Sequence, residues 1–251
     1  MFETEIRVPT DDGEMTTFIA HPDGGGPWPV GVLFMDGVGY REQIKENARR
    51  FAAGGYYVVA PDLFYRSGEK LSFDWGRMGD SAYRAELMEV VANVTPDRAL
   101  ADTNAIVEAI SEHGAASAGP KVCVGYCMGA RLALHAAAGK TVEFVAAAGI
   151  HPSALVTEAV DSPHLDVGDV RGELYFAFAE HDHSATAENV ALFRDELERQ
   201  GVTGVVERVP GTSHGFAMAD LPVYDEASCE RHFERTLELW QRSLAQKPAG
   251  L

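Results

Sequence analysis

Short apolar runs that alternate with helical segments constrain the fold of this chain most strongly. Residues 30–35 form an unbroken apolar run, as expected for a strand of a parallel sheet that is covered on both faces. Further strands are predicted at residues 57–60, 121–125, 145–150, 174–179 and 205–209. Helical patterns separate these strands, so the sequence predicts an α/β fold with a mostly parallel sheet and helices on both faces.

The segments around these strands predict an antiparallel start and five helices. The first 21 residues are typical of a hairpin that turns at Asp-Asp-Gly, residues 11–13. Helices are expected at residues 41–53, 96–113, 130–138, 187–200 and 223–244, with Thr186 as a cap of the fourth. Residues 65–95 are irregular and polar, which indicates a short excursion over the active-site side. We therefore expect a single domain over residues 1–251.

Composition and charge exclude several classes of partner. The chain has 21 basic and 38 acidic residues, a net charge of −17, which disfavours nucleic acids and anionic membrane surfaces. Three cysteines in 251 residues do not form a disulfide framework. The start of the chain has no apolar signal core, and no apolar run approaches the length of a membrane helix. These features predict a soluble cytoplasmic protein. We also expect a monomer or homodimer.

The run Gly-Tyr-Cys-Met-Gly at residues 125–129 lies between a predicted strand and a predicted helix. It matches a nucleophile elbow in which Cys127 replaces serine, because so tight a turn needs small flanking residues. The helix N-terminus favours a thiolate, and the N–H of Met128 is left to hold an oxyanion. The alternative for Cys127 is a small buried apolar residue. Cys123 and Cys229 are predicted to be structural.

A nucleophile elbow predicts an acid and then a base after later strands. Asp182 follows the strand at residues 174–179, and His214 follows the strand at residues 205–209. Glu180 is an alternative acid, although it lies nearer the strand. A metal site at His181, Asp182 and His183 lacks further ligands at a familiar spacing, so no metal is expected.

The loop after residues 30–35 is the expected source of a second oxyanion donor. The N–H of Gly37 is the candidate, and Asp36 is expected to point into the site. His151 follows another strand and either lines the pocket or is a loop histidine satisfied by backbone groups.

These residues resemble the dienelactone hydrolase family of the α/β-hydrolase fold over nearly the whole chain. The marks are Gly-Tyr-Cys-Met-Gly at 125–129, Ala-Pro-Asp-Leu at 60–63, Asp182, and Ser-His-Gly-Phe at 213–216. The resemblance implies a Cys-His-Asp triad that hydrolyses small esters or enol-lactones without a cofactor.

Two departures from the family pattern bear on specificity. The best-known members have a glutamate where Asp36 stands, and an arginine that binds the substrate carboxylate where Met218 stands. This chain is therefore expected to prefer neutral substrates, unless Arg77 or Arg84 supplies a cation. Three alternatives stay open: a thioesterase or peptidase on the same triad, a non-catalytic ligand-binding module, and a redox-sensing thiol protein.

Overall fold

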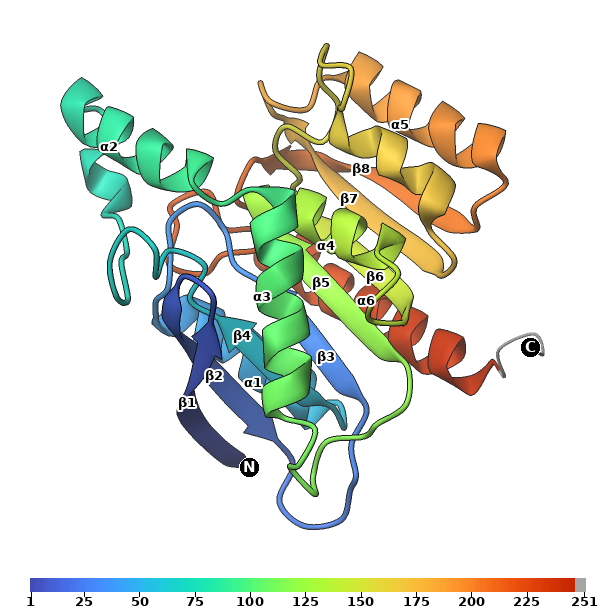
Figure 1. Ribbon diagram of the computed structural model, residues 1–251. Helices are drawn as coiled ribbons and strands as arrows, with labels where there is room; N and C mark the ends of the chain where they lie inside the picture. The colour runs from blue at the N-terminus through green and yellow to red at the C-terminus, as the bar shows by residue number, and fades with distance from the viewer. Residues whose placement is uncertain (247–251) are drawn as a thin grey trace. The chain divides into compact units, whose positions relative to one another are not determined.

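The computed structural model describes residues 1–246. The chain divides into two compact units, Met1–Ala118 and Gly119–Leu251, and each contributes four strands with helices packed on them (Figure 1). Strands and helices alternate after the two N-terminal strands, which confirms the α/β pattern read from the sequence. The expectation of one domain over residues 1–251 stays a prediction, and residues 247–251 lie outside the described part.

The strands of the first unit are β1 (Phe2–Thr10), β2 (Gly13–His21), β3 (Val30–Phe34) and β4 (Tyr57–Pro61). Their spatial order is β1-β2-β4-β3. β1 and β2 form the predicted antiparallel hairpin, β2 is antiparallel to β4, and β3 is parallel to β4. Every residue of β3 and β4 is buried, as expected for strands covered on both faces.

Two helices cover the opposite faces of these strands (Figure 1). The helix α1 (Glu42–Ala53) packs against β2 and β4, and its buried face includes Ile44, Ala48 and Phe51. The helix α3 (Pro96–Ala109) packs against β1. It ends four residues before the predicted boundary at His113.

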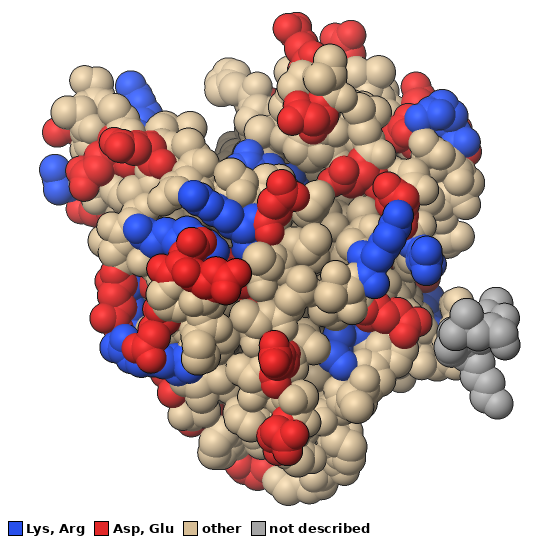
Figure 2. Space-filling view, viewed as in Figure 1, with Lys and Arg blue, Asp and Glu red and all other residues tan. Residues whose placement is uncertain are grey.

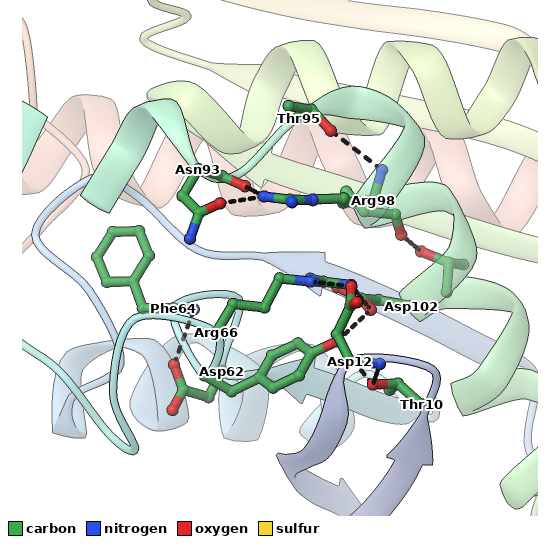
Figure 3. Close-up of polar contacts among 12 residues, drawn as sticks. Thr10, Asp12, Asp62, Phe64, Arg66, Asn93, Thr95, Arg98 and Asp102 are labelled. Atoms are coloured by element: carbon green, nitrogen blue, oxygen red, sulfur yellow. Dashed lines mark hydrogen bonds and ion pairs between the residues drawn. The ribbon is translucent and has the colours of Figure 1, made fainter. Parts of the chain in front are cut away.

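A network of polar contacts joins the hairpin, the segment after β4 and α3 (Figure 3). The guanidinium of Arg66 donates to Asp12 at 2.6 Å and to both carboxylate oxygens of Asp102 at 2.8 Å. The hydroxyl of Tyr65 donates to Asp102 at 3.0 Å and lies 2.8 Å from Thr10 Oγ1. Arg66 therefore neutralises a carboxylate, Asp102, that is only 1% exposed.

Residues 65–95 contain more regular structure than the sequence indicated. They include the 3-10 turn η1 (Trp75–Arg77) and the helix α2 (Ser81–Ala92). Asp80 caps α2 by accepting the N–H groups of Ala82 and Tyr83. No residue of α2 is buried, so α2 is not a core helix and has no apolar face packed against the sheet. This lack of a one-sided apolar pattern is why the sequence did not place a helix with defined bounds in this segment.

The second unit holds four parallel strands in sequential order. They are β5 (Lys121–Tyr126), β6 (Phe144–Ile150), β7 (Glu173–His181) and β8 (Gly204–Ser213). The strand β8 extends four residues beyond the predicted end at Val209, and β7 extends two beyond Ala179. Both extensions carry the sheet toward the residues that were predicted to be catalytic.

Helices cover both faces of these strands (Figure 1). The helix α4 (Met128–Ala138) packs on β5 and β6, and α5 (Ala187–Gln200) packs on β8. The 3-10 segment η2 (Pro163–Asp169), which the sequence did not predict, contacts both helices. The helix α6 (Glu226–Ala245) packs on the opposite face against β6 and β7.

Acidic and basic side chains are interspersed on the face shown in Figure 2. Ion pairs also form between exposed side chains, such as Arg7 with Glu69 and Lys70 with Glu5, each at 2.7 Å. None of the helices within residues 1–246 is long and apolar enough to cross a membrane.

Candidate active site

A tight turn between β5 and α4 presents Cys127 at the carboxyl end of its strand. Cys127 has φ 53° and ψ −115° and occupies the N-cap position of α4. A Cβ added to Gly125 would lie 1.9 Å from the carbonyl oxygen of Gly129, so the chain crosses itself too closely for any side chain there. Gly125 thus has the steric role that the elbow motif predicts.

Neighbouring backbone fixes the strained conformation of Cys127. Its N–H donates to the carbonyl of Ile150 at 3.0 Å, and its own carbonyl accepts the N–H of Ala130 at 3.2 Å and that of Ser153 at 3.2 Å. These bonds hold the nucleophile position between α4 and the end of β6. A non-glycine residue with positive φ persists only where its surroundings enforce it.

Strand pairing brings the predicted acid and base together. The last paired residues of β7 and β8 are His181 and Ser213, so Asp182 and His214 each follow a strand at the same level of the sheet. His214 Nδ1 lies 2.6 Å from Asp182 Oδ2. On the other side of the ring, His214 Nε2 lies 3.0 Å from Cys127 Sγ. The three side chains have the hydrogen-bonded arrangement that a nucleophile, its base and the orienting acid require.

Asp182 is anchored from two directions. Its side chain is 3% exposed; its Oδ1 accepts the N–H of Ser184 at 2.8 Å and the Ser184 hydroxyl at 2.7 Å. Burial raises the pKa of Asp182, but the hydrogen bonds and charge of His214 and the bonds from Ser184 outweigh burial and lower the pKa. Asp182 therefore stays ionised and available to orient His214.

The charge of His214 depends on its two neighbours. Burial lowers the pKa of His214, whereas the charge of a Cys127 thiolate and the hydrogen bond to Asp182 raise it to about 10. The side chain keeps 26% exposure. At neutral pH this geometry favours an imidazolium beside a thiolate.

The rival residues have other roles. Glu180 Oε2 accepts the N–H of Gly211 at 2.7 Å, so its carboxylate binds the last part of β8 just before His214. His181 is 67% exposed on its side chain and lies 4.0 Å from Glu180, and His183 is exposed. Within residues 1–246, no group of three or more His, Cys, Asp or Glu side chains is arranged to hold a metal ion.

Two residues near Cys127 were missed by the sequence reasoning. Ser153 Oγ lies 3.4 Å from Cys127 Sγ, and Arg131 lies in the first turn of α4 with Cys127 as its charged neighbour. The signal for Ser153 was its place three residues after β6. The signal for Arg131 was its spacing of four residues from Cys127, which puts helical residues on one face.

His151 is buried beside the base. It is 1% exposed and adopts a positive φ of 39°. Its ring centroid lies 5.2 Å from that of His214 and 5.5 Å from that of Phe216. Met218 is fully buried, and Met128 begins α4, where helix N–H groups have no acceptor within the helix.

The remaining predicted residues belong to the first unit. The carboxylate of Asp36 is bound by Arg41 through contacts of 2.6 and 2.9 Å and is 3% exposed. Asp36 is thus already paired with a cation. A Cβ on Gly37 would contact Val91 at 3.5 Å.

The two arginines of the excursion are exposed. Arg77 stacks 3.8 Å from the ring centre of Tyr83, and Arg84 donates to the carbonyl of Met78 at 3.0 Å. Both of these contacts are with residues of the same segment, 65–95.

Comparison with known proteins gives the family. Residues 15–244 match the model of the dienelactone hydrolase family. A protein named "Putative carboxymethylenebutenolidase" from Escherichia coli is 25% identical over 240 residues, covering 94% of this chain and 85% of that protein. A protein of the same name from Yersinia pestis is 27% identical over 247 residues, covering 96% of this chain and 85% of that protein.

Solved structures agree on the fold. The crystal structure titled "Putative Dienelactone Hydrolase" from Klebsiella pneumoniae has a TM-score of 0.84 at 23% identity, covering 96% of this chain and 98% of the other. An acylaminoacyl peptidase of Pyrococcus horikoshii has a TM-score of 0.72 at 15% identity, and this chain covers 43% of it. The α/β-hydrolase fold and the expectation of a hydrolase are confirmed. The chain belongs to the dienelactone hydrolase family.

Proposed function

We propose that this hydrolase cleaves small carboxylic esters or enol-lactones through Cys127, His214 and Asp182. The observation that carries the proposal is the pair of contacts at His214, 3.0 Å to Cys127 Sγ and 2.6 Å to Asp182 Oδ2. A thiol beside a base that is itself oriented by a carboxylate is suited to acyl transfer. The family membership supports ester or lactone bonds as the target.

The first half of the reaction acylates Cys127. The thiolate attacks the carbonyl carbon, and the carbonyl electrons move onto oxygen. The N–H of Met128 is the first donor to this oxyanion, and the N–H of Gly37 is the proposed second. The intermediate collapses as the ester oxygen leaves with the proton of His214, which forms a thioester and frees the alcohol or enol. Each oxyanion donor is worth about 3 kcal/mol.

The second half returns the enzyme to its resting state. Once the thiolate is a neutral thioester, the negative charge that raises the pKa of His214 is gone. His214 then accepts a proton from water, whose oxygen attacks the thioester carbonyl. Collapse of this second intermediate expels the thiolate and releases the carboxylic acid, and His214 is again the imidazolium partner of Cys127.

Substrates without a free carboxylate are the proposed preference. Met218 is apolar and fully buried, and a carboxylate placed beside it would be desolvated without a partner, at a cost of several kcal/mol. Asp36, where the resembling members carry a glutamate, is already paired with Arg41. The comparison of kcat/KM for a neutral lactone and its carboxylated analogue tests this preference. A carboxylated substrate that is favoured tenfold or more, about 1.4 kcal/mol, contradicts it.

Selective alkylation tests the nucleophile. Cys123 is fully buried and Cys229 is 2% exposed, whereas Cys127 retains partial exposure. Burial also raises the pKa of the Cys123 thiol. Iodoacetamide near neutral pH is therefore expected to modify Cys127 first, as read by peptide mass spectrometry, and turnover should fall in proportion.

A panel of acyl esters, lactones and thioesters gives the reaction class, with fully alkylated enzyme as the matched control. Hydrolysis of esters or lactones that disappears with alkylation supports the proposal. Turnover that survives complete modification of Cys127 removes the triad assignment. Activity confined to thioesters or peptides assigns another substrate class to the same residues.

A further inference from the structure

Arg131 occupies an unusual place for a cation. It lies in the first turn of α4 (Met128–Ala138), four residues after Cys127. The N-terminal end of a helix carries partial positive charge, so basic residues are unfavourable there and acidic ones are favoured. Side chains of a helix also lean toward its N-terminus, which for Arg131 is the direction of Cys127.

No carboxylate among residues 1–246 forms an ion pair with the guanidinium of Arg131. Its Nε is buried and has no hydrogen-bond partner within the described residues. The contrast with other arginines is clear, because Arg66 binds Asp102 and Arg41 binds Asp36. A largely buried cation without a hydrogen-bonded anion is costly, so the position of Arg131 calls for a negative charge from the site.

Cys127 is the source of that charge. Burial lowers the pKa of Arg131, and the negative charge of a Cys127 thiolate is the one influence that raises it. The groups of the second unit that lie near the sulfur include His214 at 3.0 Å, from the end of β8, and the neutral Ser153 at 3.4 Å, from the segment after β6. Asp182 acts on the sulfur through His214. The ring of His151 faces that of His214.

The formal charges of the site sum to zero only when the charge of Arg131 is included. A thiolate, an imidazolium and the Asp182 carboxylate together carry one net negative charge. A net charge in a site of low dielectric is unfavourable. The guanidinium of Arg131 adds one positive charge and brings the sum to zero.

We propose that Arg131 is a positioning residue that supplies the counter-charge for the Cys127 thiolate, so that the resting enzyme holds a preformed nucleophile in a charge-balanced site. The proposal rests on the proposed function, in which Cys127 is the nucleophile. It also deepens that function. A guanidinium already matched by the thiolate leaves no surplus positive charge for a substrate carboxylate, in keeping with a preference for neutral substrates.

The test measures the thiolate itself and needs no substrate. The pH dependence of iodoacetamide modification of Cys127 and the ultraviolet thiolate absorbance are compared for wild type, Arg131→Met and Arg131→Lys. In Arg131→Met the modification rate at neutral pH should fall about tenfold, and the absorbance midpoint should move to higher pH. Arg131→Lys keeps the charge and should stay within about threefold of wild type.

Two further variants distinguish the local charge of Arg131 from the net charge of the protein and from hydrogen bonding at the sulfur. Arg194→Met removes one exposed arginine from α5 and should leave the Cys127 titration unchanged, so it controls for net charge. Ser153→Ala removes a neutral hydrogen-bonding group and should shift the titration less than Arg131→Met. If Arg131→Met does not fold, as judged by circular dichroism, Arg131→Gln keeps polar bulk without charge and takes its place.

Two results would overturn the inference, and a third would show that the proposed function itself is wrong. A thiolate titration in Arg131→Met and Arg131→Gln that matches the Arg194→Met control overturns it. An unchanged titration with a loss of kcat/KM confined to carboxylated substrates also overturns it, and assigns Arg131 to a substrate anion. Failure of the proposed function is distinguishable, because it appears as turnover that survives alkylation of Cys127, whatever the titration shows.

Discussion

Asp182 Oδ2 lies 2.6 Å from His214 Nδ1, and this bond decides which ring nitrogen faces the nucleophile. The bond has its origin in the sheet, since the residues just before this pair, His181 and Ser213, are partners across β7 and β8. Because Nδ1 is bound to the carboxylate, Nε2 is the nitrogen that faces Cys127 Sγ, and in the proposed triad it is the nitrogen that exchanges protons with the sulfur.

Asp182→Asn should therefore disable the base while leaving the fold intact. An amide can turn its NH2 group toward Nδ1, which favours the wrong tautomer and removes the charge that supports the imidazolium. We expect kcat to fall roughly a thousandfold. The measurement is ester or lactone turnover, with thermal unfolding as the folding control. A loss of less than tenfold would point to Glu180 as the acid, and Glu180→Gln then becomes the decisive variant.

Replacement of histidines distinguishes the base from its neighbours. His214→Ala should lower turnover by about three orders of magnitude or more, because its Nε2 lies 3.0 Å from Cys127 Sγ and is the proposed proton acceptor there. His151→Phe keeps a ring against His214, and His183→Ala changes an exposed loop residue. Both should retain most of the activity. Wild-type-like turnover in His214→Ala, with loss in either of the other two, reassigns the base.

Gly125→Ala should prevent the native turn. Its Cβ would lie 1.9 Å from Gly129 O and 2.6 Å from Ala130 N, both backbone atoms, so α4 would have to move away from β5. We expect a loss of several kcal/mol in the free energy of unfolding or failure to fold. Gly114→Ala is the matched control, since its Cβ meets nothing within 4 Å. Denaturant unfolding of the two variants gives the comparison, and equal stabilities would refute the steric argument.

The ion-pair cluster of Figure 3 predicts that removing Arg66 and removing Asp12 have unequal effects on stability. Arg66→Met leaves Asp102 buried without its cation and should destabilise the fold by about 3 kcal/mol. Asp12→Ala removes a carboxylate that is 48% exposed and should cost under about 1 kcal/mol. Urea unfolding measures both. Equal losses would mean that Arg66 acts through the hairpin turn and not through Asp102.

Asp62 predicts a pH dependence of stability. Its burial raises its pKa to about 6, against the lowering effect of the backbone N–H groups of Lys70 and Phe64. Between pH 3.8, the ordinary pKa of an aspartate, and about pH 6, the folded state binds more protons than the unfolded state. The contribution of Asp62 to stability therefore decreases as pH rises through that window.

Asp62→Asn isolates this effect. The variant should gain stability relative to wild type as pH increases from 4 to 7, by about 2 kcal/mol. Urea titrations at the two pH values measure the difference between the proteins, so other titrating groups cancel. A difference that does not change with pH would show that Asp62 is not the titrating group.

The sequence was most informative where local chemistry alone fixes geometry. The elbow was predictable because Gly125 and Gly129 are needed at any crossing so tight, and Thr186 was predictable as the cap of α5. The lengths of β7 and β8 were not, because their ends depend on pairing between strands. Arg131 was missed because a basic residue in a helix pattern is ordinarily solvated, and only the structure reveals that its Nε is buried without a hydrogen-bond partner.

Cys127 carries its positive φ of 53° whatever atom stands at the end of its side chain. The backbone strain belongs to the position, and the bonds to Ile150, Ala130 and Ser153 that maintain it are all main-chain bonds. Sulfur and oxygen nucleophiles differ there by one atom. The main-chain conformation of this turn therefore does not depend on whether the side chain ends in sulfur or in oxygen. Evolution can replace the thiolate, which is a better leaving group, with the more basic alkoxide of a serine while the surrounding main chain stays in place.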